Sequence, residues 1–271
     1  MATITTFCLA GASPKPRLDN DHLGGELFRP PYQRRDIVYS NKFVAQSNFD
    51  DGRAKLKAAL LESRGQVAVL GQSLGARIAG SLMDDAEVLA ACPPERCVFV
   101  LTGHPERKYG GAATVERSGI VSGYSYTGVP DDCAYRVWDV ARQYGAPEDY
   151  PADRSVRAAV SNVSLAVHSD YTNVRIGDPR NTAWVDPENP NVTYVLAPTY
   201  PLPGIESKWW SLQRKADEDA RQRPAIEAAY DRPFPAPSTT INRIWGTDYG
   251  YDGARRGFVL MPAPAAFRPF G

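Results

Sequence analysis

Val67-Ala-Val-Leu-Gly-Gln-Ser-Leu-Gly75 joins a strand pattern to a helix pattern through a tight turn. The four apolar residues predict a short buried strand, and residues 76–83 continue at helical spacing. Between them, Gly71 to Gly75 fits G-x-S-x-G, which in this context is typical of a nucleophile elbow that presents Ser73 at its tip. The alternative interpretation is a glycine-rich turn in which the serine is incidental.

Strand and helix patterns alternate along most of the chain. Strand-like runs occur at 3–10, 36–40, 66–70, 97–102, 134–141 and 192–197, and helical spacing occurs at 50–64, 76–91 and 153–167. Such alternation predicts an α/β fold, α/β-hydrolase-like, with a mostly parallel central sheet and helices on both faces. Active sites in these sheets lie beyond the carboxyl ends of the strands, which is where Ser73 falls.

The chain has 271 residues, which is enough for one large α/β domain. We expect this domain to span residues 1–235 and to be followed by a Pro-rich C-terminal extension over 236–271. Proline clusters at 232–237 and 261–269 flank an aromatic and glycine segment at 245–253. The extension is too short for its own core, so it is expected to pack on the body or on a neighbouring subunit, as in a homo-oligomer or a virion assembly.

Charge and composition exclude several classes of protein. There are 31 Lys plus Arg and 31 Asp plus Glu, so the basic excess that nucleic-acid binding needs is missing. The sequence has no apolar run of transmembrane length, and the first ten residues predict a strand and not a signal peptide, so a soluble protein is expected. The four cysteines form no C-x-x-C pair, so no metal site is expected. Cys8, Cys97 and Cys133 fall in or beside predicted strands, which predicts buried thiols, and the alternative for Cys92 and Cys97 is a disulfide.

A serine nucleophile needs a base, and the base needs an orienting carboxylate. In α/β-hydrolases these follow the serine in the order acid, then histidine. Of the three histidines, only His168 leaves room for a strand-end acid after Ser73. Asp149 lies just past the strand at 134–141 and is the predicted acid, whereas Glu148 is its nearest competitor. The alternative role of Asp149 is a turn or N-cap residue.

The remaining predicted site residues surround this triad. The backbone N–H of Leu74 is the expected first donor of an oxyanion hole. Ala12 or Ser13, in the loop after the first strand, is expected to supply the second donor. His104 and Gln72 are candidates for the substrate side. The alternatives for His104 are a residue that supports the site from behind, or simply a loop residue.

Several segments, taken in order, resemble the PE-PPE domain, a mycobacterial serine α/β-hydrolase domain related to cutinases and to phage lysin B esterases. They are Leu101–Gly111, Gly123–Asp131, Arg142–Pro151 (the family's R-Q-Y-D-G-x-x-D-F-P), Val167–Tyr171 (V-H-x-x-Y), Thr193–Pro203 and Ala229–Arg232 (Y-D-R). The resemblance implies Ser73 as nucleophile, Asp149 as acid and His168 as base. One departure is that Tyr144-Gly145-Ala146 stands where the family has Tyr-Asp-Gly.

The resemblance and the elbow together predict a serine esterase that acts on carboxylic esters, of lipids or of the cell envelope, through an acyl-enzyme. This chemistry needs no metal or organic cofactor. One alternative is an acyltransferase that uses the same triad, and another is a virion or structural protein that keeps the fold. Free-standing relatives occur in phages, so a phage-encoded chain is a further hypothesis, which would place the protein in the host cytoplasm and then in the lysate or the virion.

Overall fold

The structure is a computed structural model that describes residues 3–13, 17–115, 128–238, 240–243 and 249–270. Part of the segment 123–131, which carries one of the family-like motifs, and part of the aromatic segment 245–253 lie outside the described residues.

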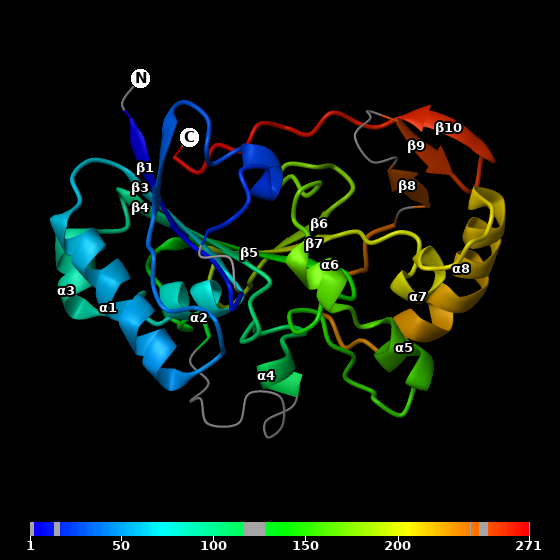
Figure 1. The fold of residues 1–271 in the computed structure, drawn as a ribbon, viewed down its shortest axis with the longest axis horizontal. Coiled ribbons are helices and arrows are strands. Elements are labelled where there is room, and N and C mark those ends of the chain that lie inside the picture. The colour runs from blue at the N-terminus through cyan, green and yellow to red at the C-terminus, as the bar shows by residue number, and fades with distance from the viewer. Residues whose placement is uncertain (1–2, 14–16, 116–127, 239, 244–248, 271) are drawn as a thin grey trace.

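Seven strands form one central sheet in the order β2-β1-β3-β4-β5-β7-β6 (Figure 1). Every neighbouring pair is parallel except β6 and β7, so the predicted mostly parallel sheet is confirmed. The strand predicted at 36–40 is displaced to 32–36, and β6 was not predicted. The strands are β1 (Ile4–Leu9), β2 (Tyr32–Asp36), β3 (Val67–Gln72), β4 (Cys97–Thr102), β5 (Arg136–Arg142), β6 (Thr182–Val185) and β7 (Val192–Ala197).

Three helices cover one face of the sheet: α1 (Gln46–Glu62), α2 (Leu74–Gly80) and α3 (Ala86–Ala91). They bury Leu60, Ile78 and Val88 against strand residues such as Val69 and Phe99. These strands carry apolar side chains on both faces, as expected for a parallel sheet that is covered on both sides.

The second face has a different cover from the helices that were expected there. The short 3₁₀ helix η1 (His22–Gly25) and the irregular segment 171–176 pack on it. Leu23 and Tyr171 belong to this cover, and they lie in the same buried cluster as Leu70 and Val140 of the sheet.

Five further helices lie beyond the carboxyl ends of the strands. They are α4 (Ala112–Val115), α5 (Arg157–Asn162), α6 (Leu165–Ser169), α7 (Pro203–Glu206) and α8 (Leu212–Glu227). Of these, α5, α7 and α8 enclose a separate small core that includes Tyr144, Leu202 and Ile226. Tyr144 stands two residues after β5, so this core holds the loop that follows β5.

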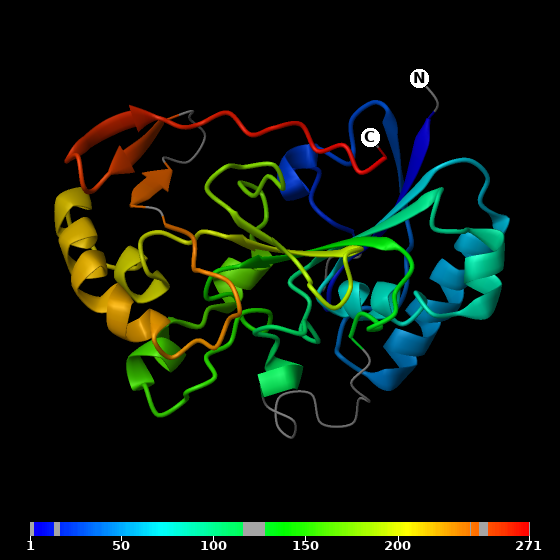
Figure 2. The same ribbon diagram turned by 180° about the vertical axis from the view of Figure 1, so that it is seen from behind.

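The last part of the chain forms a small antiparallel sheet of β8 (Ile241–Arg243), β9 (Tyr249–Asp252) and β10 (Gly257–Leu260). The segment after β10 then runs back across the molecule and ends near β1 (Figures 1 and 2). Ala265 donates its N–H to the carbonyl of Gly177 at 2.9 Å, and the Phe267 ring meets Trp138 edge-on at 4.9 Å between centroids. Phe270 packs against the cluster that contains Ile4.

All four cysteines are free and buried, which confirms the prediction of buried thiols for Cys8, Cys97 and Cys133, and Cys92 and Cys97 form no disulfide. Within the described ranges, no helix is both long enough and apolar enough to cross a membrane.

Candidate active site

Ser73 stands at a strained turn between β3 and α2. Its backbone has φ 53° and ψ −113°, a conformation that side-chain-bearing residues rarely adopt. The turn closes tightly, because a Cβ on Gly75 would lie 2.4 Å from the carbonyl oxygen of Leu9 and one on Gly71 would lie 2.4 Å from that of Gly75. The two glycines therefore permit a strand and a helix to approach closely around Ser73, which is the local geometry of a nucleophile elbow.

His168 lies beside the same edge of the sheet. It sits in the last turn of α6, whose N-cap Ser164 accepts a hydrogen bond from the N–H of Val167 at 3.3 Å. The imidazole packs on the end of β4, since a Cβ on Gly103 would lie 2.7 Å from its Nδ1. The preceding residue, Thr102, accepts the backbone N–H of Ser73 at 2.9 Å. Ser73 and His168 therefore contact consecutive residues of one strand end.

Glu148, and not Asp149, is the carboxylate against His168. Oε2 of Glu148 lies 2.7 Å from Nδ1 of His168, and its Oε1 accepts a hydrogen bond from the hydroxyl of Tyr171 at 3.1 Å. Glu148 is fully buried. The predicted acid, Asp149, instead accepts the backbone N–H of Tyr144 at 2.7 Å and pairs with Arg232 at 2.6 Å. The expected contact between Asp149 and His168 is thus corrected to one with its sequence neighbour.

The carboxylate changes the basicity of the imidazole. Burial of the ring acts to lower the pKa of His168, but the charge and hydrogen bond of Glu148 outweigh burial, and the net pKa is raised. A hydrogen bond at Nδ1 also fixes the ring orientation, and in the neutral ring it leaves Nε2 as the proton acceptor.

The two expected oxyanion donors after the first strand are not equivalent. The N–H of Ser13 donates to the carbonyl of Asn41 at 2.8 Å, so Ser13 is ruled out as a free donor. Ala12 follows Gly11, where a Cβ would lie 2.9 Å from Cβ of Ser73. Within the described part of the chain, the N–H groups of Ala12 and Leu74 meet no acceptor. Of the predicted oxyanion donors, these two N–H groups are therefore the ones that remain unengaged.

The comparison with protein families matches the PE-PPE domain over residues 31–231. The chain belongs to the PE-PPE domain family. A comparison with curated protein sequences gives no match.

Solved structures similar to this PE-PPE domain share little sequence with it. A cutinase-like protein from Cryptococcus sp. has 14% identity and a TM-score of 0.45, and the match covers 63% of this chain and 87% of that one. Lysin B from Mycobacteriophage D29 has 15% identity and a TM-score of 0.39, with 88% and 94% covered. A putative YdeN-like hydrolase from Pectobacterium atrosepticum has 11% identity and a TM-score of 0.39, with 84% and 94% covered.

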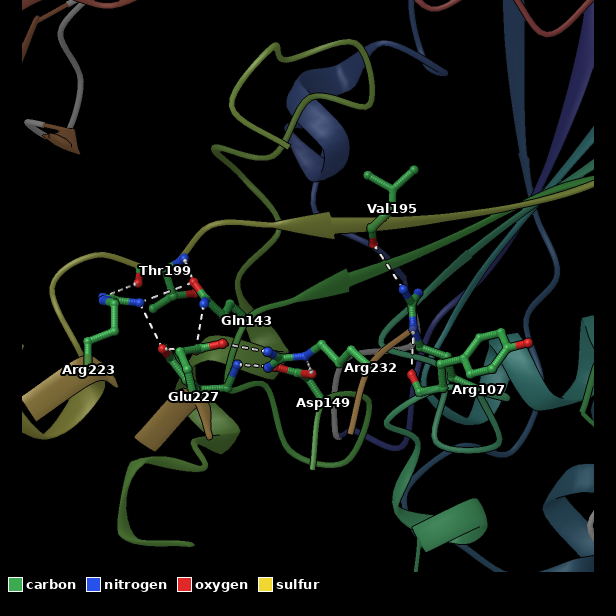
Figure 3. Close-up of polar contacts among 10 residues, drawn as sticks. Arg107, Gln143, Asp149, Val195, Thr199, Arg223, Glu227 and Arg232 are labelled. Atoms are coloured by element: carbon green, nitrogen blue, oxygen red, sulfur yellow. Dashed lines mark hydrogen bonds and ion pairs between the residues drawn. The ribbon is translucent and has the colours of Figure 1, made fainter. Parts of the chain in front are cut away.

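A buried polar network holds the loop after β5 in this PE-PPE domain (Figure 3). The guanidinium of Arg232 lies between the carboxylates of Asp149 and Glu227, at 2.6 Å from each. Glu227 also accepts hydrogen bonds from the side chains of Gln143, at 2.8 Å, and of Tyr144. The two ends of the loop are thereby tied to α8 and to the residues just after it.

The other predicted substrate-side residues have supporting positions. The side chain of His104 is fully buried, and its Nδ1 lies 3.1 Å from Asp139, which also pairs with Arg107 at 2.8 Å. Burial acts to raise the pKa of Asp139, but these two partners lower it overall. Because His104 is enclosed by this cluster, its placement on the substrate side is corrected. The amide of Gln72 donates to the backbone carbonyl of His168 at 3.4 Å and so braces α6.

Two residues of this site were missed as site residues from the sequence, namely Tyr171 and Arg232. Both stand in segments that resemble the family, V-H-x-x-Y and Y-D-R, so the signal was present. What the sequence does not reveal is that Tyr171 bonds the carboxylate of Glu148 and that Arg232 takes up Asp149.

Proposed function

We propose that this PE-PPE domain is a serine esterase in which Ser73 is the nucleophile and His168 is the general base. Glu148 orients the imidazole and stabilises its protonated form. The observation that carries the proposal is the combination of a strained serine elbow with a buried His–Glu pair at the adjacent strand end. Strained backbone conformations cluster at functional sites, where the surrounding structure holds them in place.

In the proposed reaction, Oγ of Ser73 attacks the ester carbonyl carbon while its proton passes to Nε2 of His168. The carbonyl oxygen becomes an oxyanion, which the N–H groups of Leu74 and Ala12 stabilise. The intermediate collapses to the acyl-enzyme, and the leaving alkoxide takes the proton from His168. Water then attacks the acyl group, with His168 as base again, and the carboxylic acid departs as Ser73 regains its proton.

The surroundings of the site support an ester with an apolar part as substrate. Leu165, on the same short helix as His168, is 69% exposed. Phe43 is 72% exposed and stands two residues after Asn41, whose side chain and carbonyl bond the loop that holds Gly11 and Ser13. These exposed apolar side chains, one on α6 and one on the loop after β2, support lipid or other acyl esters over small charged ones.

Labelling with a fluorophosphonate probe tests the proposal, because such probes react with activated serines. Wild-type protein is expected to be labelled and to hydrolyse p-nitrophenyl esters, whereas Ser73→Ala is expected to lose both properties. Ser81→Ala, which changes another serine near α2, is the matched control and is expected to keep both. Labelling that persists in Ser73→Ala, or wild-type protein that remains unlabelled, defeats the proposal. Adding an alcohol acceptor identifies an acyltransferase, if ester product dominates over free acid.

A further inference from the structure

Gly145 and Glu148 share one space in the loop after β5. A Cβ built on Gly145 would lie 1.9 Å from Oε1 of Glu148 and 2.5 Å from its Cδ. The carboxylate of Glu148 therefore occupies the volume that any side chain at position 145 would take. Position 145 is also the place where this chain departs from the Tyr-Asp-Gly pattern that it otherwise resembles.

The backbone at position 145 is fixed relative to His168. Gly145 and Ser164 form an isolated parallel bridge, in which Ser164 donates to the carbonyl of Tyr144 at 2.9 Å and Ala146 donates to the carbonyl of Ser164 at 3.2 Å. Ser164 is the N-cap of the helix that carries His168, and its carbonyl accepts the N–H of His168 at 3.1 Å. A side chain at position 145 thus starts from a point that is held against the same helix.

The neighbouring carboxylate cannot serve in the same way. Both oxygens of Asp149 are engaged by Arg232, at 2.9 Å and 2.6 Å. Asp149 also closes the turn, because its N–H donates to the carbonyl of Gly145 at 2.9 Å. With Asp149 turned toward Arg232, the side chain of Glu148 reaches back over Gly145 to His168 and Tyr171.

We propose that the single carboxylate that orients His168 can be supplied either from position 145 or from position 148. This chain supplies it from position 148 because position 145 is glycine. An aspartate at position 145 in a chain that lacks Glu148 would place its carboxylate in the vacated space. The backbone conformation accepts a side chain, since φ of Gly145 lies outside the left-handed region. The next nearest atom, the carbonyl oxygen of Arg142 at 3.0 Å, must move by a few tenths of an ångström. The catalytic consequence rests on the proposed function, whereas the interchange of positions 145 and 148 as the source of the carboxylate does not.

The test uses the full chain with the double variant Gly145→Asp/Glu148→Ala. Gly145→Asn/Glu148→Ala is the matched control, because asparagine has the same shape without the charge. The first readout is the pKa of His168, measured by NMR titration of its ring proton and assigned with His168→Gln. The second is kcat/KM on a p-nitrophenyl ester. Circular dichroism melting establishes that each variant is folded.

We expect the His168 pKa to be higher in the Asp double variant than in the Asn double variant, and kcat/KM to be at least about tenfold higher. Equal pKa values in the two folded proteins overturn the proposal. If the His168 pKa is raised in the Asp double variant but no protein, wild type included, hydrolyses the ester, the interchange of positions 145 and 148 is upheld and the proposed function is defeated.

Gly145→Ala alone provides a second test that does not require the double variants to fold. Its methyl group would displace the Glu148 carboxylate, so the pKa of His168 should fall relative to wild type. A folded Gly145→Ala protein with an unchanged His168 pKa also overturns the proposal, because the two side chains then do not compete for one space.

Discussion

Nδ1 of His168 lies 2.7 Å from Oε2 of Glu148, and both side chains are buried. This contact joins the loop after β5 to the short helix α6, and it gives the imidazole a fixed orientation and a raised pKa.

Glu148→Gln should lower kcat/KM for ester hydrolysis by roughly 10³- to 10⁴-fold, because a neutral amide no longer stabilises the imidazolium that forms as Ser73 attacks. The base must be unprotonated, so the acid limb of the pH profile of kcat/KM follows the pKa of His168 in the free enzyme. This limb should move to lower pH in Glu148→Gln, since the charge that raises the pKa is gone. The exposed Glu62→Gln is the control, and an unmoved limb in Glu148→Gln would count against the pairing.

The same pair should appear in the pH dependence of stability. The folded-state pKa of His168 is raised, so its contribution is fully present below the unfolded-state pKa and is lost as pH rises through the folded-state pKa. The loss of stability caused by Glu148→Gln should therefore be larger at pH 6 than at pH 9. Urea unfolding at the two pH values measures this, and an equal loss at both would contradict the assigned interaction.

Arg232→Met should destabilise the fold by about 3–5 kcal/mol, because it leaves the buried carboxylate of Asp149 without its partner. The side chains of Arg232 and Asp149 are only 5% and 3% exposed, so water cannot replace the lost contact. The control is Arg221→Met, which breaks the pair with Glu218 at a side chain that is 68% exposed and should cost at most about 1 kcal/mol. Chemical denaturation of the two variants decides whether the network in Figure 3 stabilises the fold.

His22 gives a prediction for acidic pH. Its Nε2 lies 3.0 Å from Oγ1 of Thr102, and burial, as the largest effect, lowers the pKa of His22 to about 3. The unfolded chain takes up a proton below about pH 6.5 while the folded chain does not, so stability falls as pH decreases from 6.5 toward 3. Between pH 7 and pH 5 this term amounts to about 2 kcal/mol. His22→Asn should lack it, so its unfolding free energy should fall less steeply than that of wild type over this range; parallel curves would refute the assignment.

The strained turn at Ser73 and the choice of His168 as its candidate base could be predicted from the sequence, because one signal is local and the other is the order of residues along the chain. A buried apolar run, two glycines and a helical repeat are contiguous around Ser73, and His168 is the histidine in the right chain order. The carboxylate that contacts His168 could not be predicted at the level of one residue. Glu148 and Asp149 are adjacent in a turn and face opposite sides, and Arg232, which engages Asp149, lies 83 residues further along the chain.

The misplaced elements have similar physical reasons. Residues 36–40 were predicted as a strand because Ile37 and Tyr39 are apolar, and both are indeed buried, but in irregular structure after β2. β2 itself is an edge strand of polar composition, Tyr-Gln-Arg-Arg-Asp, and carries no apolar alternation. The helix α8 was not predicted, because it is mostly polar and its buried residues are only Ala216, Asp219 and Ile226.

The segment after β10 supports the last prediction. Phe267 meets the ring of Trp138 edge-on and packs on the face of the sheet that η1 and residues 171–176 also cover. Phe267→Ala removes a partly buried aromatic ring and should cost about 2 kcal/mol, below the range for a fully buried phenylalanine. Phe258→Ala, at a ring that is 64% exposed on β10, is the matched control and should change stability by about 0.5 kcal/mol or less.

Neither variant should alter fluorophosphonate labelling of Ser73 at temperatures where the protein is folded, because Phe267 contacts the sheet through β5 rather than the elbow. Equal melting temperatures for Phe267→Ala and wild type would show that this segment does not stabilise the sheet.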